Sequence, residues 1–215
     1  MTILNWSEVW ALLIPLFVLS IRGSQPKYLQ PVIVYLWFAL MINLIGDIIG
    51  DFKTYLPNWL QSNNVLYNIH SIFRFTCFCS FFFLLPQASF QILKKALPVV
   101  FVIFITINFT VKDDFFNPAH LSGNLLAGEA YLLLIYCMTY YLAQLKEDKK
   151  VFTRGKEFWV VTGLSIYVVT NFFVFLFYVP MIRDNPVVAV NMWSIHNVAY
   201  ILLCISVARS FYVVS

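Results

Sequence analysis

Long apolar runs separated by short polar connections make up almost the whole chain. Seven such runs can be drawn, at residues 7–22, 28–50, 63–86, 96–112, 121–145, 156–179 and 187–211. Each is close to the roughly 20 residues that a helix needs to cross a bilayer. The pattern predicts an all-α membrane protein in which seven transmembrane helices form a single domain over residues 1–215.

A few polar side chains interrupt these runs at helical spacing. In the third run, Tyr67, His70 and Arg74 lie three and four residues apart, so they share one helical face. In the seventh run, Trp193, His196 and Tyr200 repeat that spacing. Ionisable groups in hydrocarbon cost at least a few kcal/mol each, so they normally face the interior of a helix bundle. We therefore expect both sets to point inward.

The polar positions recur in the same order in the two halves of the chain. The matching pairs are Glu8 with Glu129, Asn43 with Asn171, and His70 with His196. These matches predict two related three-helix halves, at about 1–87 and 119–215, joined by a linking helix at about 96–112. Because the linker is a single helix, the two halves would run in the same direction across the membrane.

This plan of three, one and three helices resembles the architecture of the opsins and of the PQ-loop sugar transporters. The resemblance is architectural only. The seventh run has no Lys that could form a Schiff base with retinal. The Pro86-Gln87 pair ends the third run, whereas the transporters carry theirs in the first and fifth. The resemblance implies a fold and no particular ligand.

Composition supports the membrane prediction and excludes several other classes. The chain is 61% hydrophobic and 11% charged, whereas soluble proteins carry about 25% charged residues. The net charge of +4 is spread over the connections, so we expect no nucleic-acid partner. The four cysteines lie inside apolar runs and show no CxxC or zinc spacing, so neither disulfides nor a metal site is predicted.

The distribution of basic residues predicts the orientation. One set of alternate connections carries Arg22, Lys27, Lys94, Lys95, Lys146, Lys149, Lys150, Arg154, Lys156 and Arg209. The other set carries only Lys53, Lys112 and Arg183. Basic connections stay in the cytoplasm, which places the N-terminus outside and the C-terminus in the cytoplasm of a plasma or inner membrane. No connection is long enough for a soluble domain, so any output would need a membrane or cytoplasmic protein partner.

The polar residues of the runs form the candidate site. The predicted ligand-binding residues are Tyr67, His70, Arg74, Glu129, Trp193, His196 and Asn197. The supporting polar residues are Asn43, Asp47, Asn68 and Asn171. The polar members fall in the outer halves of their helices, which predicts a cavity open to the outside. Arg74 is expected to pair with Glu129 or Asp47, since an unpaired charge there would be costly.

Several functions are compatible with this pattern. The first is a sensor, a receptor or an accessory subunit that binds a small molecule or ion. The alternatives are a small-solute or proton-coupled transporter, and an intramembrane metal-dependent hydrolase that uses both histidines with a carboxylate. Two further hypotheses are that His70 and His196 are axial haem ligands, and that the polar residues only hold the helices together. The sequence assigns no catalytic residue and no cofactor.

Overall fold

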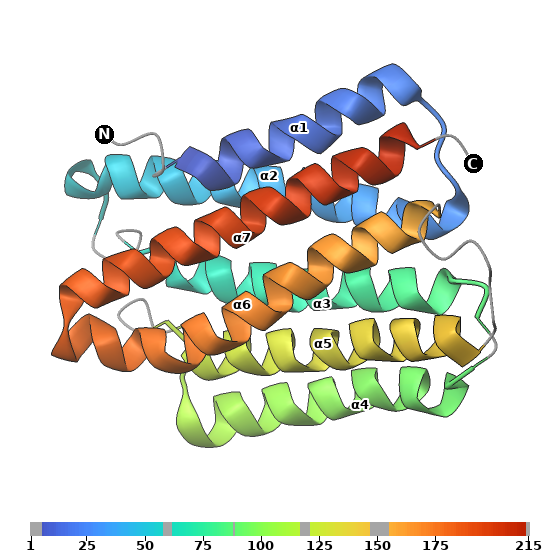
Figure 1. Cartoon of the computed structure of the whole chain (residues 1–215). Helices are drawn as coiled ribbons and strands as arrows, with labels where there is room; N and C mark the ends of the chain where they lie inside the picture. Colours follow the sequence, from blue (N-terminus) through green and yellow to red (C-terminus); the bar gives the residue numbers. More distant parts are fainter. Residues whose placement is uncertain (1–5, 58–61, 88, 117–120, 147–154, 214–215) are drawn as a thin grey trace.

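In the computed structural model the chain folds into a bundle of roughly aligned helices (Figure 1). The structure describes residues 6–57, 62–87, 89–116, 121–146 and 155–213. Within these ranges there are seven α-helices and no strand. They are α1 (Ser7–Arg22), α2 (Gln30–Asp51), α3 (Asn64–Leu84), α4 (Gln91–Ile107), α5 (Gly123–Lys146), α6 (Lys156–Asp184) and α7 (Pro186–Tyr212). Three short helical turns complete the set: η2 (Lys27–Leu29), η3 (Lys53–Tyr55) and η5 (Asn108–Lys112), the last a π-helical turn that continues α4.

The helices close into a ring. In the order α1, α2, α3, α5, α6, α7, each helix contacts the next, and α7 contacts α1. We call this arrangement the helix ring. Helix α4 lies outside it, against α3 and α5, and forms one edge of the bundle in Figure 1. The start of α1 and the end of α7 lie at opposite ends of the bundle (Figure 1).

Local sequence explains where several helices begin and end. Helix α1 ends at Gly23, whose φ of 63° is readily adopted only by glycine. Helix α7 begins with Pro186, and the side chain of Asn185 accepts a hydrogen bond from the backbone N–H of Val188 at 3.3 Å. Asparagine before proline is a strong helix start, because the side chain satisfies a free N–H and proline lacks one.

The helices agree with the predicted runs except at two ends. Helix α4 begins at Gln91, earlier than the predicted 96, and α6 continues to Asp184, beyond the predicted 179. The apolar run marks where a chain meets hydrocarbon, whereas a helix continues until its backbone is capped. Lys94 is buried in the first turns of α4, and Pro180 is accommodated inside α6.

Five of the described helical segments are long and apolar enough to cross a membrane: Lys27–Asp51, Gln91–Lys112, Gly123–Lys146, Lys156–Asp184 and Pro186–Tyr212. Helix α1 has 16 residues, which span about 24 Å. Helix α3 is long enough but carries buried polar residues, among them His70 and Arg74. The fold is therefore that of an all-helical protein with the length and apolarity of an integral membrane protein.

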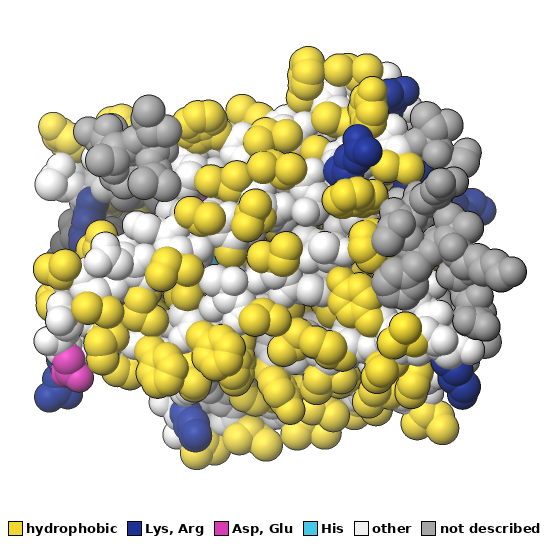
Figure 2. Space-filling view, in the orientation of Figure 1, with side chains coloured by type: hydrophobic (Ala, Val, Ile, Leu, Met, Phe, Trp, Pro, Cys, Tyr) yellow, Lys and Arg dark blue, Asp and Glu magenta, His cyan; other side chains and the backbone are white. Residues whose placement is uncertain are grey.

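The outer surface has the character expected of a protein in lipid. Figure 2 shows hydrophobic side chains across the middle of the bundle, with Lys and Arg gathered toward the helix ends. Large apolar residues such as Phe17, Val102 and Phe173 are more than half exposed. Of the basic residues that predict the orientation, Lys149, Lys150 and Arg154 lie outside the described residues.

Close packing of α6 on α7 depends on Gly163. A Cβ atom at this position would lie 2.5 Å from the Cβ of Ser206 and 3.3 Å from the Cα of Leu203. Gly50, near the end of α2, has no atom within 4 Å of a Cβ placed there. The two glycines therefore form a matched pair, one packed and one free.

We expect Gly163→Ala to destabilise the protein and Gly50→Ala to leave it unchanged or slightly more stable. Overpacking costs about 1–3 kcal/mol, whereas replacing an unhindered helical glycine by alanine gains up to about 1 kcal/mol. Thermal unfolding in detergent measures both. A Gly163→Ala variant as stable as Gly50→Ala would contradict the close α6–α7 contact.

Candidate functional site

A buried ion pair joins α3 to α5. Arg74 Nε donates to Glu129 Oε1 at 2.6 Å and Arg74 Nη2 donates to Oε2 at 2.6 Å. Ser71 on α3 also donates to Oε2, at 2.5 Å. The third nitrogen, Nη1, donates to the hydroxyl of Tyr167 on α6 at 2.6 Å. The geometry is bidentate, which is the strongest form of a carboxylate–guanidinium contact. Of the two predicted partners, Arg74 pairs with Glu129.

The geometry around His196 fixes the positions of its protons. Asn171 Nδ2 donates to the backbone oxygen of Tyr167 at 2.8 Å, so the amide oxygen of Asn171 faces His196. That oxygen lies 2.5 Å from His196 Nδ1, which must be the N–H donor. The other nitrogen, Nε2, lies 3.5 Å from Oε1 of Glu8 on α1. In the neutral imidazole Nε2 carries a lone pair, so two acceptors face each other.

His70 takes a different position in the same region. Its ring stacks on Tyr35 of α2, with ring centres 5.8 Å apart and planes at 16°. The Tyr35 hydroxyl in turn donates to the hydroxyl of Tyr200 on α7 at 3.3 Å. His70 is buried, and among the described residues its Nε2 atom has no hydrogen-bond partner.

These side chains surround a small cavity inside the helix ring. Its lining residues are Glu8, Tyr67, His70, Arg74, Leu126, Tyr167, Phe175, Trp193, His196 and Tyr200. The cavity measures about 10 Å³, which is close to the minimum for one water molecule. The predicted cavity therefore has room for about one water molecule. Most of its wall is aromatic, and Tyr67 meets Trp193 edge to face with ring centres 5.6 Å apart.

The carboxyl groups near this cavity differ in their basic partners. The guanidinium of Arg74 is matched by Glu129, and it is the only Lys or Arg among the lining residues. Glu8 contacts no Lys or Arg in the described part of the chain, and its side chain is 12% exposed. Asp47 is close enough to Glu8 for the two carboxylates to interact electrostatically. The region near Glu8 therefore holds two carboxyl groups and, within the described residues, no Lys or Arg paired with Glu8.

The structure brings most of the predicted site residues together. Tyr67, His70, Arg74, Trp193 and His196 all line the cavity. Three predicted residues do not line the cavity. Glu129 lies behind Arg74, Asn197 is buried outside the lining, and Asn171 acts through His196.

The remaining supporting residues lie farther from the cavity. The amide of Asn68 donates to the backbone oxygen of Phe115 at 3.1 Å, which ties α3 to the segment after η5. Asn43 is buried, and within the described ranges its Nδ2 atom has no partner. Asp47 is partly buried near Glu8.

Sequence reasoning missed Glu8, Tyr167, Tyr200 and Tyr35 as members of the site. A signal existed for Glu8, because the repeat places it opposite Glu129. Tyr200 shares a helical face with Trp193 and His196, but it was interpreted as a packing residue. Tyr35 and Tyr167 carried no signal that distinguishes a site residue from a packing residue, since a buried tyrosine is common in either role.

Two further findings bear on function. Among the described residues, no three His, Cys, Asp or Glu side chains come together in a way that could hold a metal ion. The metal-dependent alternative thus has no ligand set within that part of the chain. Comparisons with protein-family models, with curated proteins and with solved structures gave no match.

The ion pair should dominate the stability of this region. Removing one partner leaves a buried charge unmatched, which costs about 3–5 kcal/mol. We therefore expect Arg74→Met and Glu129→Leu each to lower the Tm strongly, and the double variant to recover most of the loss. Thermal unfolding of the purified variants measures this coupling. Lys95→Met, which removes an exposed charge, is the control, and additive losses in the double variant would contradict a matched pair.

Proposed function

We propose that the chain is a seven-helix integral membrane protein built from two related halves. The order of the helix ring supports this, because exchanging α1, α2, α3 with α5, α6, α7 maps each contact of the ring onto another. Helix α4 lies outside the ring, as a linker would. The polar side chains of α3 that lower its apolarity are turned inward, so its outer face remains compatible with lipid.

The proposed role is to bind a protonated amine or ammonium ion in the cavity. One observation carries this proposal: Glu8 Oε1 and His196 Nε2 face each other at 3.5 Å with no Lys or Arg of the described chain beside them, and with a neutral imidazole both atoms are acceptors. An N–H donor nitrogen at ordinary hydrogen-bond distance from both atoms, about 2.9 Å, would complete a triangle with them. It would also supply a positive charge beside the carboxylate of Glu8.

The surrounding residues favour an ammonium group over a hard metal cation. Hard cations such as calcium and magnesium take six or more oxygen ligands, whereas this cavity offers one carboxylate and imidazole nitrogens. The Nε2 of His70 is a further group without a partner in the described chain, and it lines the same space. The aromatic faces of Tyr67, Phe175 and Trp193 are suited to cation–π contact. An ammonium ion also matches a cavity the size of a water molecule.

A sensor or an accessory subunit fits better than a transporter. Beyond Arg74, toward the end of the bundle that carries Arg22 and Lys156, the ring interior is filled by fully buried side chains such as Phe78 and Leu203. This packing provides no polar path for a solute. We propose that ligand binding changes how the helices pack, and that a membrane or cytoplasmic partner protein reads the change.

Ammonium and methylammonium should stabilise the purified protein, and sodium at equal ionic strength should not. A ligand at ten times its Kd adds about 1.4 kcal/mol of stability, which raises the Tm by a few degrees for a domain of this size. Differential scanning fluorimetry with the chloride salts measures the effect.

The matched variants are Glu8→Gln and Asp184→Asn. The first removes the carboxylate of the cavity and should abolish the response to amines. The second removes an exposed carboxylate at the end of α6 and should leave the response intact. Equal Tm shifts in wild type and Glu8→Gln, or no shift with any amine, would rule out this site. Amine flux into proteoliposomes would instead favour the transporter.

The seven-span arrangement has its own test. Cysteine placed at Ser24, between α1 and α2, should react with a membrane-impermeant maleimide only after cells are permeabilised. Cysteine placed at Thr54, between α2 and α3, should react in intact cells. Both positions are exposed, and the four native cysteines are buried and give a low background. Labelling of both positions from the same side would contradict the arrangement.

A further inference from the structure

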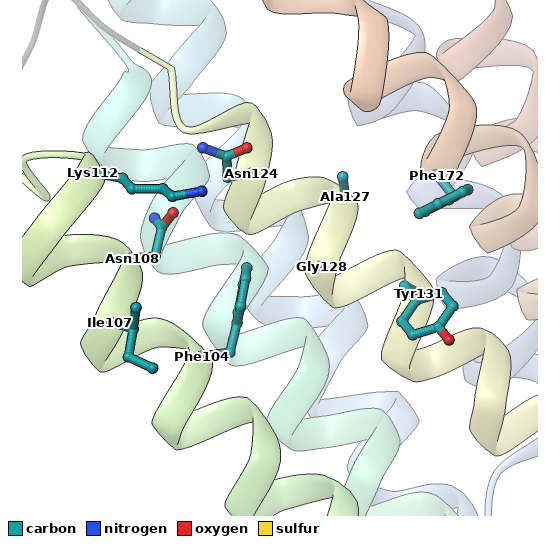
Figure 3. Close-up of a pocket in the computed structure, with 9 residues that line it drawn as sticks. All are labelled: Phe104, Ile107, Asn108, Lys112, Asn124, Ala127, Gly128, Tyr131 and Phe172. Carbon is teal, nitrogen blue, oxygen red and sulfur yellow. The ribbon is translucent and has the colours of Figure 1, made fainter.

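A groove on the outside of the bundle crosses α5 between α4 and α6. It measures about 360 Å³, which is within the range of small-molecule sites. Its lining residues are Phe104, Ile107, Asn108, Lys112, Asn124, Ala127, Gly128, Tyr131 and Phe172, as shown in Figure 3. Most of this lining is apolar, and the polar members gather at one end.

The apolar part of the groove depends on a glycine, Gly128, which has no side chain. A Cβ atom on Gly128 would lie 2.5 Å from the ring of Phe104, so glycine lets that ring lie against the backbone of α5. Ile107 and Tyr131 border the groove and are about half exposed. Figure 3 shows Tyr131 and Phe172 at the end away from Lys112. This floor is suited to an alkyl chain.

The polar end carries a cation, Lys112, that has no counter-ion among the described residues. In Figure 3 the side chain of Lys112 extends toward Asn124, with Asn108 beside it. Within the described residues, no carboxylate lies within ion-pair distance of Lys112. Its neighbour Asp113 instead accepts hydrogen bonds from Ser122 at 2.5 Å and from Asn108 at 3.2 Å. A phosphate group would supply the missing anion.

Asn108 adds an acceptor with no donor. Its Nδ2 donates to Asp113 Oδ2 at 3.2 Å and to Ser122 Oγ at 3.1 Å, which fixes the amide so that Oδ1 points away from both. The residue is 2% exposed, and in the described chain Oδ1 has no partner. A buried acceptor of this kind requires an N–H or O–H donor.

We propose that this groove binds a phospholipid with an ethanolamine headgroup. Lys112 and Asn124 hold the phosphate, the ammonium N–H groups donate to Asn108 Oδ1, and an acyl chain lies along Phe104, Gly128 and Tyr131. The polar end of the groove places a cation, Lys112, near a buried acceptor, Asn108 Oδ1, which is complementary to a headgroup that carries a phosphate and an ammonium. A choline headgroup has no N–H donor for Asn108, and a phosphatidylglycerol headgroup offers only a neutral O–H donor, which makes a weaker hydrogen bond than an ammonium.

Native mass spectrometry of the purified protein tests the proposal. Dioleoyl phosphatidylethanolamine is added at increasing concentrations, beside the choline and glycerol lipids with the same chains and beside inorganic phosphate. The ethanolamine lipid should bind at least about tenfold more tightly than each of the others, as expected for one charge-assisted hydrogen bond. Lys112→Ala should weaken its binding by about tenfold for the same reason.

Two matched controls distinguish binding in the groove from nonspecific binding of lipid to the protein surface. Lys53→Ala removes an exposed lysine at the same end of the bundle and should leave binding unchanged. Ile107→Trp fills the groove and should abolish binding, whereas Ile103→Trp changes an equally exposed residue of α4 outside the groove and should not. Equal binding of the choline lipid, preference for the glycerol lipid, binding of phosphate alone, or an unaffected Lys112→Ala variant would each overturn the proposal.

Discussion

A charge buried among helices must be matched where it lies, and the pair of Arg74 and Glu129 meets that requirement here. Both carboxylate oxygens and three guanidinium nitrogens are engaged, and every partner is supplied by α3, α5 or α6. Such a pair adds little net stability compared with apolar packing, but losing one partner is costly. It therefore acts mainly as a constraint. It fixes the relative position of three helices and leaves the rest of the polar site to be arranged around it.

The two proposed halves differ at one position that determines whether a nearby carboxylate has a basic partner. At the spacing that matches His70 with His196, Arg74 corresponds to Tyr200. Glu129 in one half thus meets a guanidinium, whereas Glu8 in the other meets a histidine nitrogen at 3.5 Å. A single difference between arginine and tyrosine therefore neutralises one carboxylate and leaves its counterpart without a fixed cation. In this interpretation the contact between the halves at α3 and α5 is fixed by the ion pair, and the contact at α7 and α1 is left for the proposed cation.

The sequence predicted the helices and the inward faces well, because both follow from periodicity and from the cost of charge in hydrocarbon. That Arg74 pairs with a carboxylate was predictable for the same reason, but the choice of Glu129 over Asp47 was not. The start of α4 and the end of α6 could not be predicted, since hydropathy shows where the lipid-facing stretch ends and not where the helix backbone is capped. The small size of the cavity was not predictable either. It depends on how Tyr67, Phe175 and Trp193 pack against one another, and aromatic packing between distant helices has no periodic signal in the sequence.

Helix α5 connects the interior site with the outer groove. It carries Glu129 on its inner face, and the next residue toward its start, Gly128, lies on the face that meets Phe104 of α4. Helix α4 has no place in the ring and packs mainly on α5 and α3, the two helices joined by the ion pair. A lipid bound between α4 and α5 would therefore act on the same helix that positions Glu129 and, through Arg74, Tyr167. Only α5 thus lies between the groove on α4 and the carboxylate of the buried ion pair, so the proposed lipid would be in direct contact with the helix that carries Glu129.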